Sequence, residues 1–261
     1  MSIAILSAAG AAKGAVAPAN FGLWEALNHG GALSWTIFII MVVMSIFSFY
    51  ILFTKLIDQN KVMKQYDAVR ANFWRANTLE EGAAKLDKNN AYRQLVDDGI
   101  AASKQHSLLT DPVEAHDWLH GAMMRSEGSI NNKLTGGLSF LATVGATAPF
   151  IGLLGTVIGI YRALIEIGIA GQADIGKIAG PVGEALIMTA IGLMVAVPAV
   201  LAYNWLQARN KAIARNLAGF SNDVLGYISS GGRLKPAVTA APAARPTAPA
   251  PAAGATTAVK K

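Results

Sequence analysis

The chain has 261 residues, of which 53% are hydrophobic and 15% charged, and its mean hydropathy is +0.39. Ordinary soluble domains carry about 25% charged residues, so this composition excludes such a domain and indicates a membrane protein. The sequence contains no cysteine, which excludes disulfides, iron–sulfur clusters and thiolate zinc sites.

The net charge of +6 does not indicate nucleic-acid binding, because its distribution is uneven. From Arg209 onward there are eight basic residues and one acid, so this segment contributes +7 and the rest of the chain −1. No basic groove with interleaved aromatic residues is apparent. We expect no nucleic-acid partner and no cofactor.

Three stretches lack Lys, Arg, Asp and Glu altogether: 30–54, 134–161 and 185–208. About 20 mainly apolar residues cross a bilayer as a helix. We therefore expect transmembrane helices at 33–54, 134–169 and 181–208, the last with an alternative start near residue 174. The expected fold is an oligomeric all-α integral membrane protein whose three transmembrane helices extend into a helical cytoplasmic region.

Basic residues flank the end of the first span, the start of the second and the end of the third, and such flanks lie in the cytoplasm. The N-terminus should thus be translocated and the C-terminus cytoplasmic. The expected segments outside the membrane are a translocated tail at 1–32, a cytoplasmic helical loop at 55–133, a translocated link at 170–180 and a cytoplasmic helix at 209–235.

Helix-start signals within the loop indicate that it is mostly α-helical. Thr78 and Glu81 have the spacing of a capping box, and Asp111-Pro112 followed by Glu114 has the order of a second helix start. Because only isolated glycines interrupt the run from Pro112, we expect this helix to continue into the second span. Residues 236–261, with five of the ten prolines, should form a disordered Ala/Pro tail.

Motifs of soluble chemistry are weak. His116 and His120 are four apart on an expected helix, but no third metal ligand stands out, so a solvated helix face is the better interpretation. The glycine run at 152–159 resembles a phosphate loop but lacks its Gly-Lys-Ser/Thr ending and lies in an apolar span. Neither a metal site nor a nucleotide site is expected.

The glycines of the spans are better explained by close helix packing in a bilayer. Glycines recur at three- and four-residue spacing in the second span, and small residues including Gly192 do so in the third. The expected packing positions are Gly152, Gly155, Gly159, Gly192 and Ala196. Pro198 adds a local feature, because it leaves the carbonyl of Met194 without its helical donor.

Glu184 is the ionisable residue nearest the middle of an otherwise uncharged segment. If the third helix begins at Pro181, Glu184 is a first-turn acid favoured by the helix dipole. If it begins near Asp174, Glu184 lies about 15 Å inside the helix, where a charge is costly and indicates function.

Two threonines lie at similar depth on the expected antiparallel hairpin. Thr156 and Thr189 could face each other, and their hydroxyls can hold water or relay a proton. A hydrogen bond from each hydroxyl to its own helix is the simpler alternative. Arg162 and Glu166, four apart near the outer helix end, are expected to form an interfacial ion pair.

The segment LATVGATAPFIGLLGTVIGIYRALIEIG followed by GPVGEALIMTAIGLMVAVPAVLAYN closely resembles the MotA/TolQ/ExbB proton-channel family, and within it the ExbB branch. The resemblance covers roughly a quarter of the chain. It implies a non-enzymatic bacterial inner-membrane motor subunit, and it places the translocated segments in the periplasm. By matching motif, the family's proton-pathway residues fall on Thr156, Glu184 and Thr189.

The resemblance also implies partners: a homopentamer that encloses the transmembrane helices of ExbD, which supplies the main proton-accepting Asp, and TonB, which drives import of siderophores and vitamin B12. A TolQ-like subunit of the Tol-Pal system is the alternative within the family. A membrane scaffold that only assembles partners is the alternative outside it, and Glu184 discriminates between a motor and a scaffold.

Overall fold

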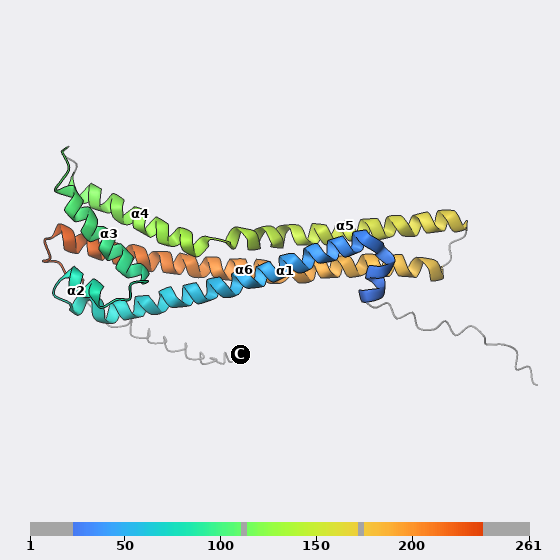
Figure 1. Cartoon of the computed structure of the whole chain (residues 1–261), viewed down its shortest axis with the longest axis horizontal. Coiled ribbons are helices and arrows are strands. Elements are labelled where there is room, and N and C mark those ends of the chain that lie inside the picture. The colour runs from blue at the N-terminus through green and yellow to red at the C-terminus, as the bar shows by residue number, and fades with distance from the viewer. Residues whose placement is uncertain (1–22, 111–113, 172–174, 237–261) are drawn as a thin grey trace, which may run out of the picture. The chain divides into compact units, whose positions relative to one another are not determined.

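The computed structural model describes residues 23–110, 114–171 and 175–236. Every regular element in these ranges is helical, which confirms the expected all-α class (Figure 1). Three helical segments are long and apolar enough to cross a membrane, namely Gly30–Arg75, Ala115–Ile169 and Gly180–Ser229. The elements are α1 (Leu23–Asn72), the short 3-10 helix η1 (Phe73–Arg75), α2 (Leu79–Ala84), α3 (Ala91–His106), α4 (Ala115–Thr135), α5 (Leu138–Ala170) and α6 (Ile175–Ser229).

The chain divides into two compact units. The apolar unit comprises residues up to 61 together with 129–215, and the charged unit comprises 62–128 together with the residues from 216 onward. Within the apolar unit, α1 and α6 run in the same direction and α5 runs opposite to them (Figure 1).

Small and medium apolar side chains fill the interior of the apolar unit, where three helices meet. Larger ones stay exposed on the same helices: Ile46 is 62%, Phe150 71% and Met194 73% exposed. Apolar exposure of this extent suits contact with lipid or with other protein helices. The main buried cluster consists of Leu27, Ile37, Met41, Val144, Ala148, Met188, Ala196 and Ala199.

The charged unit contains the expected capping box. The hydroxyl of Thr78 accepts a hydrogen bond from the backbone N–H of Glu81 at 3.2 Å, so α2 starts where the sequence predicts. The hydrogen bond from Lys85, with a second from the N–H of Asn77, holds the pKa of Glu81 below its usual value. The second start signal, Asp111-Pro112, lies outside the described residues, and so do residues 237–261 of the expected tail.

Two glycines with positive φ break the regular helix geometry near the first two spans. α1 begins at Leu23, ten residues before the expected span. It bends at Gly31, where φ is 65° and ψ is −158°. Gly137 has φ 84°, and α4 ends at Thr135 before α5 begins at Leu138. The expected helical run from the loop into the second span is thus interrupted at Gly136 and Gly137, because a residue with positive φ breaks the helical hydrogen bonds.

Candidate functional site

Glu184 is buried inside the apolar unit although it carries a carboxyl group. Only 3% of the residue is exposed. It lies nine residues beyond the first residue of α6, which is about 14 Å along the helix axis. The structure thus matches the earlier of the two helix starts, and Glu184 is not a first-turn acid. Asp174, considered as the cap of that start, lies outside the described residues.

The partner of this carboxylate comes from α1. Ser34, 5% exposed, donates its hydroxyl to Oε1 of Glu184. Gly30 packs against the same oxygen so closely that a Cβ at this position would overlap it. Since burial of a polar group without hydrogen bonds is costly, the Ser34 hydroxyl stabilises the Glu184 side chain in this position.

The bend in α1 lies between Gly30 and Ser34. The backbone angles of Gly31 fall in a region almost restricted to glycine. On the N-terminal side of the bend, Leu27 is 0% exposed and belongs to the main buried cluster. Arg162 on α5 donates to the carbonyl oxygen of Gly30, so a third helix holds the bend.

This contact of Arg162 replaces the ion pair expected from sequence. Glu166 is exposed, and none of the ion pairs within the described residues joins it to Arg162. The guanidinium instead reaches the Gly30 carbonyl at the bend, a contact between α5 and α1 that i, i+4 spacing cannot reveal.

Thr156 and Thr189 are brought together, their two hydroxyl oxygens in hydrogen-bond contact between α5 and α6. The Thr156 hydroxyl also lies 3.2 Å from the carbonyl oxygen of Ala185 and 3.3 Å from that of Gly152. Ala185 directly follows Glu184, and Thr189 is five residues on. The hydroxyl pair therefore lies close to Glu184 along α6, and each hydroxyl can donate one hydrogen bond and accept others.

Glycine backbones form the contact of α5 with α6 around this pair. A Cβ on Gly152 would lie 2.8 Å from the carbonyl oxygen of Met188, and one on Gly192 would lie 2.8 Å from that of Ala148. Cβ atoms on Gly155 and Gly159 would lie 2.7 Å and 2.9 Å from the Cβ atoms of Met188 and Ala185. Ala196, 3% exposed, continues this surface.

A second buried polar cluster joins α1 to α6 farther along both helices. Nε2 of Gln59 donates to Oδ1 of Asn210 at 2.7 Å and to the carbonyl oxygen of Leu206 at 2.9 Å. Gln59 is 0% and Asn210 3% exposed. Beside them, Arg209 donates to Oδ1 of Asn60 at 2.5 Å.

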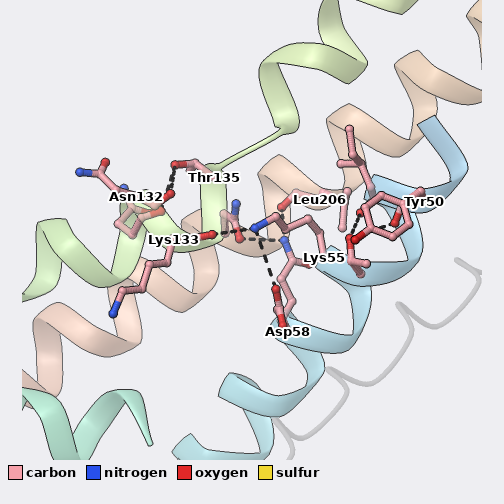
Figure 2. Close-up of polar contacts among 12 residues, drawn as sticks. Tyr50, Lys55, Asp58, Asn132, Lys133, Thr135 and Leu206 are labelled. Atoms are coloured by element: carbon pink, nitrogen blue, oxygen red, sulfur yellow. Dashed lines mark hydrogen bonds and ion pairs between the residues drawn. The ribbon is translucent and has the colours of Figure 1, made fainter. Parts of the chain in front are cut away.

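Figure 2 shows how Lys55 joins α1 to the end of α4. Its ammonium group donates to the carbonyl oxygen of Lys133 at 2.7 Å and lies 3.9 Å from Asp58. A cation at a helix C-terminus is favourable, because the last carbonyls lack helical donors. Lys55 therefore stabilises the end of α4 just before the break at Gly137.

A small cavity adjoins the proline of α6. It has a volume of about 10 Å³, and Ser45, Ser48, Met194 and Pro198 are among the residues that line it. Ser48 donates to the carbonyl oxygen of Met44, on its own helix. Met194, whose carbonyl lacks the helical donor that Pro198 removes, is thus among the residues that border this mainly apolar cavity.

The histidine pair shows no sign of metal binding. The rings of His116 and His120 are stacked with centroids 6.2 Å apart. Within the residues that the structure describes, no group of three or more His, Cys, Asp and Glu side chains could hold a metal ion.

Sequence reasoning missed Ser34, Gly30 and the Gln59–Asn210 pair. Serine is common in apolar spans and usually bonds to its own helix, as Ser48 does, so composition does not distinguish Ser34. The usable signal was the adjacent pair Gly30-Gly31 at the edge of the first span, which allows a bend and close packing.

The comparisons with known proteins agree with this architecture. A model of the MotA/TolQ/ExbB proton channel family matches residues 88–218. Biopolymer transport protein ExbB of Xanthomonas campestris pv. campestris is 35% identical over 214 residues, covering 78% of this chain and 85% of that protein. The protein of the same name from Neisseria meningitidis is 35% identical over 194 residues, covering 72% and 88%.

A relative with a different name also matches. Tol-Pal system protein TolQ of Pseudomonas aeruginosa is 29% identical over 210 residues, covering 77% of this chain and 90% of that protein. The family model spans both of the last two membrane helices, including Thr156, Glu184 and Thr189. On this evidence the chain belongs to the MotA/TolQ/ExbB proton channel family.

Proposed function

We propose that the chain is an ExbB-like motor subunit of the inner membrane. It uses the proton-motive force, together with an ExbD partner, to energise TonB-dependent import of siderophores and vitamin B12 across the outer membrane. The observation that carries this proposal is the buried Glu184, hydrogen-bonded by Ser34 and followed on α6 by the Thr156–Thr189 hydroxyl pair. The ExbB relatives, aligned over most of the chain, support the choice of branch.

The chemistry of the site suits proton transfer between carboxyl groups. In this proposal the Glu184 carboxylate accepts a proton on one oxygen and later returns it to water or to the partner's acid. The hydroxyls of Thr156 and Thr189 hydrogen-bond water along the proton path. One proton that moves down about 100 mV releases roughly 2.3 kcal/mol. This energy does work only if the passage of the proton is tied to a conformational step.

The proposal includes an orientation and an assembly. The N-terminus and the 170–180 link lie in the periplasm, and the charged unit and C-terminus lie in the cytoplasm, as the basic flanks require. Copies of the chain associate into a homopentamer around the ExbD helices. The exposed apolar side chains of α5 and α6 supply surfaces for these contacts and for lipid.

The decisive experiment replaces Glu184 in cells that lack every homologous subunit. We expect Glu184→Gln and Glu184→Ala to abolish TonB-dependent uptake of a radiolabelled siderophore while the ExbD partner still co-purifies. Glu166→Gln is the matched control, since Glu166 is an exposed acid in the same unit. Normal uptake by Glu184→Ala would overturn the proposal.

A TolQ-like role is the second candidate, favoured by the TolQ relative that covers 77% of this chain. Expression of the chain in strains lacking either ExbB or TolQ separates the two: rescue of siderophore uptake supports the ExbB role, and rescue of detergent resistance alone supports the TolQ role. If the chain is a scaffold without ion movement, no Glu184-dependent rescue is expected in either strain.

A further inference from the structure

The N-terminal turns of α1 make four contacts that converge on Glu184 or on the bend beside it. Ser34 donates to the carboxylate, and Gly30 packs on the same oxygen. Arg162 holds the Gly30 carbonyl, and Leu27 is buried among the core residues of the unit. Leu27 and Gly30 lie before the bend at Gly31, and Ser34 lies after it.

This arrangement keeps water from the carboxylate. A straight α1 would direct residues 23–30 along the axis of the span, away from the core that Leu27 enters. The backbone angles of the bend are unfavourable for residues other than glycine. Such a conformation persists only when surrounding contacts stabilise it. A carboxyl group that is 3% exposed cannot exchange protons with water until something around it moves.

We infer that residues 27–34 form an inhibitory latch over Glu184, with Ser34 as the positioning residue that holds the carboxyl group in its covered place. Arg162 and Leu27 keep the latch closed, and release of the bend at Gly31 exposes Glu184 to water. The claim that this release admits protons rests on the proposed function. The claim that residues 27–34 cover residue 184 does not.

Plain packing and a latch predict different results when these contacts are removed. If residues 27–34 only stabilise the fold, their loss lowers stability and leaves the exposure of residue 184 unchanged in the assembled protein. If they form a latch, residue 184 becomes accessible while insertion and assembly persist. Accessibility is therefore the quantity to measure.

The absence of cysteine from the chain makes this measurement direct. Glu184→Cys is placed in the full-length protein with its partner in inner-membrane vesicles, and its reaction with a water-soluble methanethiosulfonate is timed. We expect slow reaction, and about a tenfold faster one when Gly31→Ala is added, because a side chain disfavours the bent backbone. Gly168→Ala is the control, since Gly168 has helical angles and open space around it.

A second pair of variants guards against misfolding by Gly31→Ala. Leu27→Ala removes the fully buried anchor of the latch, and Leu33→Ala shortens a 41% exposed side chain of the same helix. The inference requires faster modification with Leu27→Ala and an unchanged rate with Leu33→Ala. Unchanged rates with both Gly31→Ala and Leu27→Ala, or a parent rate equal to that of Cys at the 82% exposed Ile169, would overturn it.

The role of Ser34 is tested on the native carboxyl group. Dicyclohexylcarbodiimide adds to protonated, reachable carboxyl groups, and mass spectrometry quantifies its adduct at Glu184. Ser34→Ala should raise this labelling several-fold and Ser34→Thr should restore the parent level, whereas Ser48→Ala, which removes an equally buried hydroxyl bonded to its own helix, should not change it. Equal labelling of the Ser34→Ala and Ser48→Ala proteins would remove Ser34 from the latch.

These readouts separate the latch from the proposed function. If the latch variants expose residue 184 but Glu184→Ala supports normal uptake, the latch stands and the motor proposal falls. If Glu184→Ala abolishes uptake but no latch variant changes the accessibility of residue 184, the motor proposal stands and the latch falls.

Discussion

Gln59 and Asn210 hydrogen-bond to each other in the interior of the apolar unit, and each retains one buried atom without a partner. These atoms are Oε1 of Gln59 and Nδ2 of Asn210. Burial of an unpaired polar atom costs about 1–3 kcal/mol, so the two amides depend on each other. Removing one of them leaves the other with still fewer hydrogen bonds.

The energetic dependence of this pair gives a first prediction. Asn210→Leu alone should lower the free energy of unfolding by about 1–3 kcal/mol, because Gln59 then loses a buried partner. Adding Gln59→Leu should restore most of that loss. Thermal unfolding of the purified protein in detergent, analysed as a double-mutant cycle, measures the coupling. Additive losses would contradict the dependence.

Thr156 gives a second prediction, which concerns the proposed proton path. Thr156→Val keeps the volume but removes the hydroxyl that contacts Thr189, so uptake should fall at least tenfold if each lost hydrogen bond in the path costs about 1.4 kcal/mol. Thr143→Val on the same helix is the control, because the Thr143 hydroxyl is exposed and bonds only to the Ser139 carbonyl. Equal uptake by the two variants would exclude the hydroxyl pair from the path.

Tyr92 in the charged unit gives a third prediction. It is 0% exposed, and its hydroxyl is a buried group without a hydrogen-bond partner. Burial, with smaller contributions from Tyr66 and Asp67, raises the pKa of Tyr92 above its usual value of 10.0. The folded state thus disfavours the ionised form, and the stability present below pH 10 is lost as the pH rises above it.

Tyr92→Phe should therefore leave the melting temperature unchanged or higher at neutral pH and make it fall less between about pH 10 and 11. Thermal unfolding followed by circular dichroism over this pH range checks both statements. Tyr66→Phe serves as the control for a neighbouring, less buried tyrosine. A lower melting temperature of Tyr92→Phe at pH 7 would show that the hydroxyl has a stabilising partner.

The orientation of the chain gives a fourth prediction. Cysteine at the exposed Ser107 should react with an impermeant maleimide only after the inner membrane is opened. Cysteine at Ile169, near the C-terminal end of α5, should react from the periplasm. Labelling of Ser107→Cys in intact inner membranes would reverse the topology.

The three spans and the Thr78 helix start could be predicted because each depends on residues close together in sequence. Uncharged stretches identify the spans, and a capping box needs only four residues. The position of Glu184 depended on where α6 begins, and local sequence allowed two starts. The contact of Arg162 with Gly30 could not be predicted, because it lies beside the bend at Gly31, and two consecutive glycines allow a bend without specifying its direction. The contact of Ser34 could not be predicted, because a serine in an apolar span usually bonds to its own helix.

The hydrogen bonds from α1 to α6 bear on how the apolar unit can move. Ser34–Glu184 and Gln59–Asn210 are separated by 25 residues of α1, about 37 Å of helix, and the partners differ in number by 150 and 151. Two parallel helices that are hydrogen-bonded at two distant points cannot slide past each other while both contacts remain. Between α5 and α6, the close glycine contacts are accompanied by hydrogen bonds of Thr156 to the Thr189 hydroxyl and the Ala185 carbonyl oxygen. Sliding of α1 along α6 therefore requires the loss of at least one of these two hydrogen-bonded contacts.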